Sequence, residues 1–200
     1  MAFRDFTFPD VQQTLGLSLS GAALFAGIPA VNLREEFAAW IREGTDLALE
    51  IDTEKARSEF IIAPVLLELR RSLGGSFGIF SGIEFNVDAS RGLNGFCDFI
   101  LTKLPRQMIL TTPLVAIVEA KNDNVRYGLG QCIAAMVAAQ EFNRRADSNV
   151  GTIYGVVTTG SAWKFLQLRE TEVTVDIHEY YINDLGRIMG ILTYILRDAS

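Results

Sequence analysis

The chain has 200 residues, 49% of them hydrophobic, and a formal net charge of −6. This length and apolar content suffice for one globular domain, residues 1–200, and exclude a disordered chain. The acidic balance does not favour nucleic acid as a partner, because nucleic-acid-binding proteins normally present a basic face. The single histidine, His178, excludes a zinc site built from two histidines.

Cysteine content and hydropathy bear on the compartment. Cys97 and Cys132 both lie in apolar surroundings and are too few for a disulfide framework. We therefore expect reduced, buried thiols in a cytoplasmic protein. Residues 11–33 carry no charge, but glycine, proline, glutamine and serine lower their hydrophobicity below that of a spanning helix. No membrane partner is expected.

Residues 1–51 are expected to form an N-terminal accessory arm, built from short apolar pieces that glycines interrupt. Within it, Asn32 is a candidate N-cap for a helix that runs to about Arg42 and ends at Gly44.

The next helix is predicted to begin at the N-cap Thr53, to be kinked or broken at Pro64, and to end before Gly74. Glu59 lies three, four and seven residues before apolar positions of this helix, so an α-helix would place it on the apolar stripe. A buried carboxylate there needs a partner. That partner is either an arginine such as Arg57 or a functional site.

Three strands are predicted next, with short connections that favour antiparallel pairing. A helix, further strands and a final helix capped by Asn183 or Asp184 follow. The ranges are strands at 77–87, 95–103 and 114–121, a helix at 127–145, strands at 151–158, 162–168 and 172–177, and a helix after 184. The fold class is thus α/β: a mixed sheet flanked by helices, with a helical N-terminal arm and, in residues 169–200, a strand and a C-terminal helix. The apolar stripe of that helix either covers the sheet or contacts a second subunit, so a homodimer is possible.

The segment Leu114 to Lys121 combines a buried strand with charge at its end. Glu119 and Lys121 are two apart in a strand and therefore point the same way. Asp98 lies within the apolar strand 95–103, and if the two strands are neighbours the three side chains converge. Two close carboxylates repel unless a hard cation such as Mg²⁺ or Mn²⁺ lies between them. A lysine beside such an ion suits metal-assisted phosphodiester hydrolysis. The alternative is an ordinary Glu–Lys pair at a strand end.

Asp98, followed after 20 residues by Glu119-Ala120-Lys121, resembles the motif of the PD-(D/E)XK nuclease superfamily. Residues 52–168 also show the order helix, three strands, helix, strand, which is the αβββαβ core of that restriction-endonuclease-like fold. Cys97 stands where the motif has proline.

The resemblance implies roles for individual residues. The carboxylates of Asp98 and Glu119 and the backbone carbonyl of Ala120 would bind Mg²⁺ or Mn²⁺, and Lys121 would position the attacking water. The resemblance also implies that a glutamate from the preceding helix reaches the metal, for which Glu59 is the candidate. Gln131 would support the lysine or contact the substrate, or it is a solvated glutamine.

Two functions are therefore expected from the sequence. The first is a Mg²⁺-dependent nuclease acting on DNA or RNA, with DNA the more probable substrate. The second is a non-catalytic module that keeps the fold and binds a protein or a nucleotide, which the acidic charge favours. Four basic residues are candidates for phosphate contacts or for solvated surface positions: Lys103, Arg106, Arg126 and Lys164.

Overall fold

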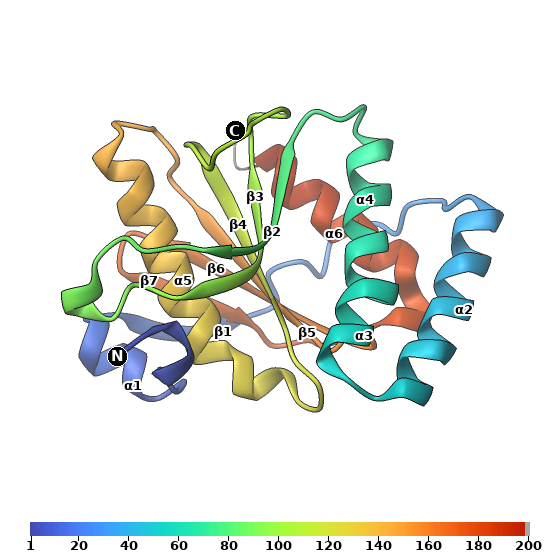
Figure 1. Ribbon diagram of the computed structural model, residues 1–200, viewed down its shortest axis with the longest axis horizontal. Coiled ribbons are helices and arrows are strands. Elements are labelled where there is room, and N and C mark those ends of the chain that lie inside the picture. Colours follow the sequence, from blue (N-terminus) through green and yellow to red (C-terminus); the bar gives the residue numbers. More distant parts are fainter. Residues whose placement is uncertain (199–200) are drawn as a thin grey trace.

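An eight-stranded mixed β-sheet forms the centre of the computed structural model, which describes residues 1–198 (Figure 1). The strand order is β1-β7-β6-β5-β4-β3-β2, and β8 pairs with β6 beside this path. The strands are β1 Ser18–Ala22, β2 Gly78–Glu84, β3 Phe96–Thr102, β4 Leu114–Ala120, β5 Ile153–Thr158, β6 Ala162–Arg169, β7 Glu172–Asp176 and β8 Tyr180–Tyr181. The mixed α/β class expected from the sequence is confirmed.

Helices cover both faces of this sheet (Figure 1). They are η1 Phe3–Asp5, α1 Asp10–Leu15, α2 Glu35–Ile51, α3 Glu54–Arg57, the π-helical turn η2 Ser58–Ile62, α4 Ala63–Ser72, η3 Ala89–Arg91, α5 Val125–Arg145, η4 Ile182–Asp184 and α6 Leu185–Asp198. Within residues 1–198, no helix combines the length and apolar character that crossing a membrane requires.

The strands β2, β3 and β4 form two consecutive antiparallel pairs, as the short connections predict. β4 then pairs in parallel with β5. A parallel pair needs a crossover connection, and α5 provides it. β4 therefore lies between two partners inside the sheet, and all seven of its residues are buried. This explains its nearly continuous apolar sequence.

Two hydrophobic layers hold the helices against the sheet. On one face, α5 packs its alanines and Ile133 together with η1 and α1. On the other face, α2, α4 and α6 bury residues such as Phe37, Leu66 and Ile188. The stripe of α6 thus covers the sheet. Asn124 starts α5, because its side-chain Oδ1 accepts a hydrogen bond from the Arg126 N–H at 2.8 Å.

The helix α2 differs from the expectation at both ends. It begins after Arg34 rather than Asn32, and it continues through Gly44 to Ile51. Gly44 is buried within the helix where α2 meets η2, and a Cβ at this position would overlap the carbonyl oxygen of Phe60. The glycine therefore permits a close approach of two helices instead of ending one of them.

The helical segment from Glu54 to Ser72 is continuous but contains the π-helical turn η2 directly before Pro64. The predicted N-cap is confirmed, since Thr53 Oγ1 accepts a hydrogen bond from the Ala56 N–H at 3.1 Å. A π turn adds one residue to the helical repeat, so residues before and after it do not share the face that α-helical spacing predicts.

The first 51 residues contribute more to the sheet than an accessory arm would. β1 pairs in parallel with β7 and forms one edge of the sheet. This strand was not predicted because it is only five residues long and lies among Gly16, Gly21 and Gly27, which suggest turns. The pair β8 and β6 was missed for a similar reason, because β8 contains only Tyr180 and Tyr181.

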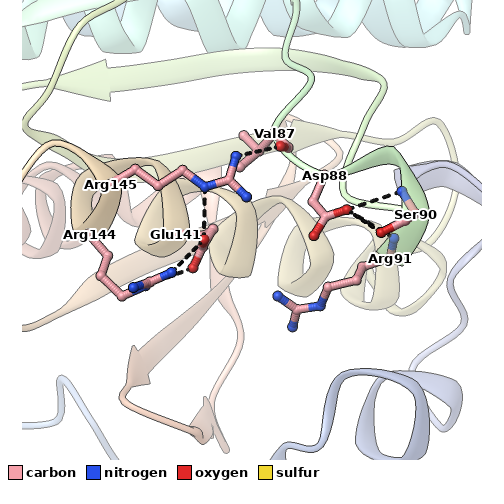
Figure 2. Close-up of polar contacts among 7 residues, drawn as sticks. All are labelled: Val87, Asp88, Ser90, Arg91, Glu141, Arg144 and Arg145. Carbon is pink, nitrogen blue, oxygen red and sulfur yellow. Dashed lines mark hydrogen bonds and ion pairs between the residues drawn. The ribbon is translucent and has the colours of Figure 1, made fainter.

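A cluster of charged groups joins the end of α5 to the connection between β2 and β3 (Figure 2). Glu141 accepts hydrogen bonds from Arg144 at 2.9 and 2.7 Å and from Arg145 Nε at 2.8 Å. Arg145 Nη1 also donates to the Val87 carbonyl at 2.7 Å. The hydrogen bonds from Arg144 are the main reason that the pKa of Glu141 falls to about 2.

We expect Gly44→Ala to lower the free energy of unfolding by about 1–3 kcal/mol, because the added Cβ meets backbone that cannot move away cheaply. Chemical denaturation measures this change. Gly27→Ala is the matched control, since its Cβ would meet nothing within 4 Å. Equal stabilities of the two variants would contradict the account of Gly44 given above.

We expect Glu141→Gln to destabilise the protein at pH 7 by about 1–2 kcal/mol, because charged hydrogen bonds to two arginines are lost. The folded pKa of Glu141 is depressed to about 2, so its contribution is present above the unfolded pKa of about 4.3 and disappears as pH falls through 2. Unfolding followed from pH 7 to pH 2 should show the variant and the wild type converging. A gap that stays constant with pH would argue against the pair.

Candidate functional site

The strands β3 and β4 bring the two predicted carboxylates together at one end of the sheet. Phe99 lies opposite Val118 in this antiparallel pair, and Asp98 and Glu119 are the next residues along each strand, directly beyond this last register pair. Their carboxyl groups interact, since the charge of Asp98 is among the causes that raise the pKa of Glu119. Residues 21 positions apart in the chain therefore converge because β3 and β4 are neighbours in the sheet.

Glu119 is completely buried, with an exposed fraction of 0%. Its Oε2 accepts a hydrogen bond from Gln131 Nε2 at 2.7 Å, and its Oε1 is buried with no hydrogen-bond donor. Asp98 is half-buried, and its Oδ2 accepts from the Ala120 N–H at 2.8 Å. Each carboxyl group is thus held in place by one donor from the protein.

Burial raises the pKa of Glu119 well above its usual value. The charge of Asp98 raises it further, while Lys121 opposes the shift. The Asp98 carboxyl is also within hydrogen-bonding reach of Glu119. Because neither group has a proton to donate when both are ionised, the contact is favourable only with a shared proton or a cation.

Lys121 follows β4 and lies along the same side as Glu119. Its Nζ donates to the Ala120 carbonyl oxygen at 2.7 Å, and its backbone N–H donates to Thr158 at 2.9 Å. The aliphatic stem passes over Gly128 of α5, where a Cβ would lie 3.0 Å from Lys121 Cγ and 2.5 Å from Val157 Cγ1. Gly128 therefore leaves the space through which the lysine reaches the site.

The structure places Glu59 away from this site. Its carboxylate pairs with Lys55 Nζ at 2.6 Å, and its side chain is 52% exposed. The prediction that Glu59 joins the carboxylates is wrong. It assumed α-helical spacing to Ile62 and Leu66, and the π turn that begins at Ser58 changes that spacing.

Glu54, one helical turn earlier, is the glutamate that interacts with the site. It is exposed on the rim of the cluster, at the start of α3. Desolvation raises its pKa, Lys121 lowers it and Asp98 raises it, so its carboxylate senses both groups. The sequence did contain a signal for this residue. Thr53 is the N-cap, so the helix begins at Glu54, and Glu54 lies at the N-terminal end of α3.

Arg57 is a further residue that sequence reasoning did not place at the site. Its buried guanidinium donates to Asn122 Oδ1 at 3.2 Å, to the Thr159 carbonyl at 3.2 Å and to Asp52 Oδ1 at 2.9 Å. It therefore connects α3 to the loop after Lys121 and to the end of β5. No local pattern in the sequence marked it, because its partners lie in distant segments of the chain.

The two cysteines are free and buried, as expected from their apolar neighbours. Cys97 precedes Asp98 in β3 and Cys132 follows Gln131 in α5, and both belong to the hydrophobic layer between α5 and the sheet. Burial is the largest cause that raises the pKa of each thiol, and the Glu119 charge adds to it. Neither thiol is activated as a nucleophile.

The donor set at this site fits a hard cation only in part. Within residues 1–198, no group of three or more Asp, Glu, His and Cys side chains is arranged to hold a metal ion. The site offers two carboxylates, the carbonyl oxygen of Ala120 and a buried Oε1 without a donor. This all-oxygen set suits Mg²⁺ or Mn²⁺ that retains several water ligands, and Glu54 stands within electrostatic reach of it.

The four basic residues expected near phosphates are divided between the two ends of the sheet. Arg126, in the first turn of α5, lies at the same end of the sheet as Lys121. Lys103 and Arg106 follow the end of β3, in the loop that leads into β4, and so lie at the opposite end from Glu119. Lys164 pairs with Val157 in the sheet and donates to the Ile177 carbonyl at 3.4 Å.

Comparisons of the chain with models of protein families, with characterised proteins and with solved structures found no match. The functional argument therefore depends on the geometry of Asp98, Glu119, Lys121, Gln131 and Glu54.

We expect Glu119→Gln to raise the melting temperature at pH 8 in EDTA by at least about 2 °C. The raised folded pKa of Glu119 means that the wild type loses stability as pH rises above the unfolded value of about 4.3. A glutamine has no charge to bury and its amide can donate to Asp98. Thermal unfolding from pH 5 to pH 8 should show the advantage growing with pH. Glu59→Gln is the exposed control, and a Glu119 variant that melts at or below the wild-type temperature at pH 8 would contradict the burial argument.

Proposed function

We propose that this chain is a Mg²⁺-dependent phosphodiesterase that hydrolyses nucleic acid, with a site of the PD-(D/E)XK kind. The observation that carries the proposal is the buried Oε1 of Glu119, which has no donor and lies next to a second carboxyl group. Unpartnered buried carboxylates cost stability and are retained at functional sites. The order of elements from α3 to β5 supports the same assignment.

Each residue of the site has its own role in such a reaction. Asp98, Glu119 and the Ala120 carbonyl would hold the ion, and Gln131 fixes the orientation of Glu119. When bound, the ion supplies neutralisation of the carboxylates and polarises a phosphoryl oxygen. Lys121 Nζ, directed to the Ala120 carbonyl, is placed to orient a water and to donate to the developing negative charge.

Arg57 acts as a positioning residue in this proposal. It holds Asn122 and Thr159, which follow Lys121 and β5 in the chain, and so defines the loop beside the lysine. Glu54 adds a carboxylate at the rim, where it would bind the ion through a water molecule or accept a proton from the attacking water.

The second candidate is a non-catalytic module that binds a protein or a nucleotide. Two observations favour it: the net charge of −6, and the lack of a third metal-ligating side chain in a preformed group within residues 1–198. The two candidates differ in whether metal binding leads to bond cleavage.

We expect Mg²⁺ or Mn²⁺ to raise the melting temperature of the wild type by mass action, and Asp98→Asn to remove most of that rise. Thermal unfolding at increasing metal concentration measures it. Glu59→Gln is the matched control, because it removes a carboxylate that pairs with Lys55 outside the site, and it should keep the full response.

The same proteins, incubated with DNA and RNA in Mg²⁺, decide between the two candidates. We expect cleavage by the wild type and by Glu59→Gln. Lys121→Met should reduce the rate by at least about 100-fold, since it removes a transition-state donor. A wild type that responds to metal but cleaves no nucleic acid would support the binding module instead.

A further inference from the structure

A pocket of about 360 Å³ opens directly beside the carboxylate pair. Its lining residues are Ala2, Arg4, Gly95, Phe96 and Gln131. Gln131 is also the donor to Glu119 Oε2, so the pocket and the buried pair share a wall. Its volume is within the range of sites for small organic groups.

Phe96 lines this pocket, and Tyr127 lies one helical turn before its lining residue Gln131; both aromatic side chains are exposed to solvent. Phe96 is 67% exposed and Tyr127 is 79% exposed, more than any other aromatic side chain of residues 1–198. Phe96 precedes Asp98 by two residues in β3. Tyr127 precedes Gln131 by four residues in α5, so the two lie next to each other on one face of the helix.

The N-terminal arm places a positive charge at the same pocket. Phe3 and Phe6 are buried, and the Phe3 N–H donates to the Asn94 carbonyl at 2.8 Å. Gly130 allows the arm to cross α5, because a Cβ there would overlap the Phe6 carbonyl. These contacts hold Arg4, whose side chain is 85% exposed. Its pairing with Asp5 spans 3.8 Å between solvated groups, so a phosphate can compete with it.

We propose that this pocket binds an unpaired nucleotide, with its base against Phe96 and Tyr127 and its phosphate at Arg4. The proposal rests on the function proposed above and defines its substrate class as single-stranded or locally unpaired DNA or RNA. Bases inside a duplex have no free faces for stacking, whereas every unpaired base offers one. A chain of net charge −6 gains little from long-range attraction to phosphates, so stacking supplies affinity that charge does not.

Binding can be measured without hydrolysis in the full-length Asp98→Asn protein in EDTA, by fluorescence anisotropy with labelled oligonucleotides of one sequence. The probes are single-stranded DNA, single-stranded RNA and duplex DNA. We expect at least about fivefold tighter binding of a single strand than of the duplex. Adding Phe96→Ala or Tyr127→Ala should weaken single-strand binding by at least about fivefold and leave duplex binding unchanged. Adding Arg4→Ala should reduce the salt slope by about 0.7.

Met108→Ala is the matched control, because Met108 is fully exposed in the loop at the opposite end of the sheet. It should bind all probes as the parent does. Equal affinity for single strands and duplex, or unchanged single-strand binding by the Phe96 variant, would overturn the inference. Cleavage by the wild type in Mg²⁺ is read separately. Stacking-dependent binding without cleavage would overturn the proposed hydrolysis alone, and cleavage with intact binding by the Phe96 variant would overturn the pocket alone.

Discussion

Two carboxyl groups within hydrogen-bonding reach, with no donor between them, determine the chemistry at this end of the sheet. Glu119 lies on the strand β4 and is fully buried, and Asp98 lies near it on the neighbouring strand β3. Their closeness follows from the pairing of β3 with β4, whose last register pair is Phe99 with Val118. The surrounding donors satisfy only one oxygen of Glu119. The fold therefore keeps a local site that a proton or a cation stabilises.

The frame around the carboxylates depends on close approaches that only small residues allow. Gly128 leaves room for the Lys121 stem between α5 and Val157, and Gly130 leaves room for the N-terminal arm on the same helix. A single helix thus carries the amide that orients Glu119 and the surface over which the lysine passes. The same helix seats the arm that holds Arg4. Its alanines pack it against β4 and β5 with little side-chain freedom to lose.

The sequence predicted those parts of the fold that local patterns determine. The apolar run before Glu119 gave the central strand, and the Thr53 cap gave the start of α3. The α/β class followed from the alternation of such elements. The expectation that Asp98 and Glu119 converge if their strands are neighbours agrees with their interaction, because β3 and β4 pair in the sheet.

Other parts depended on contacts between distant segments, which a local pattern does not contain. Gly44 was interpreted as the end of a helix, whereas its role is set by Phe60 on a neighbouring helical segment. Glu59 was chosen by counting α-helical turns, and the π turn at Ser58–Ile62 made that count wrong and left Glu54 facing the site. Arg57 has meaning only once Asn122 and Thr159 lie beside it.

The net charge of −6 is the main physical argument against a nucleic-acid substrate, so the charges near the site decide how strong this argument is. Several carboxylates are paired locally: Glu141 with Arg144 and Arg145, and Glu68 with Arg34 and Arg71. These pairs use arginines as well as carboxylates, so they leave the net charge of −6 unchanged, and affinity for nucleic acid must come from contacts at the site itself. Arg4 and the exposed ring of Phe96 line the same pocket beside the site. A substrate recognised through the faces of its bases needs few phosphate contacts, so an acidic chain and a nucleic-acid substrate are compatible where the bases are unpaired.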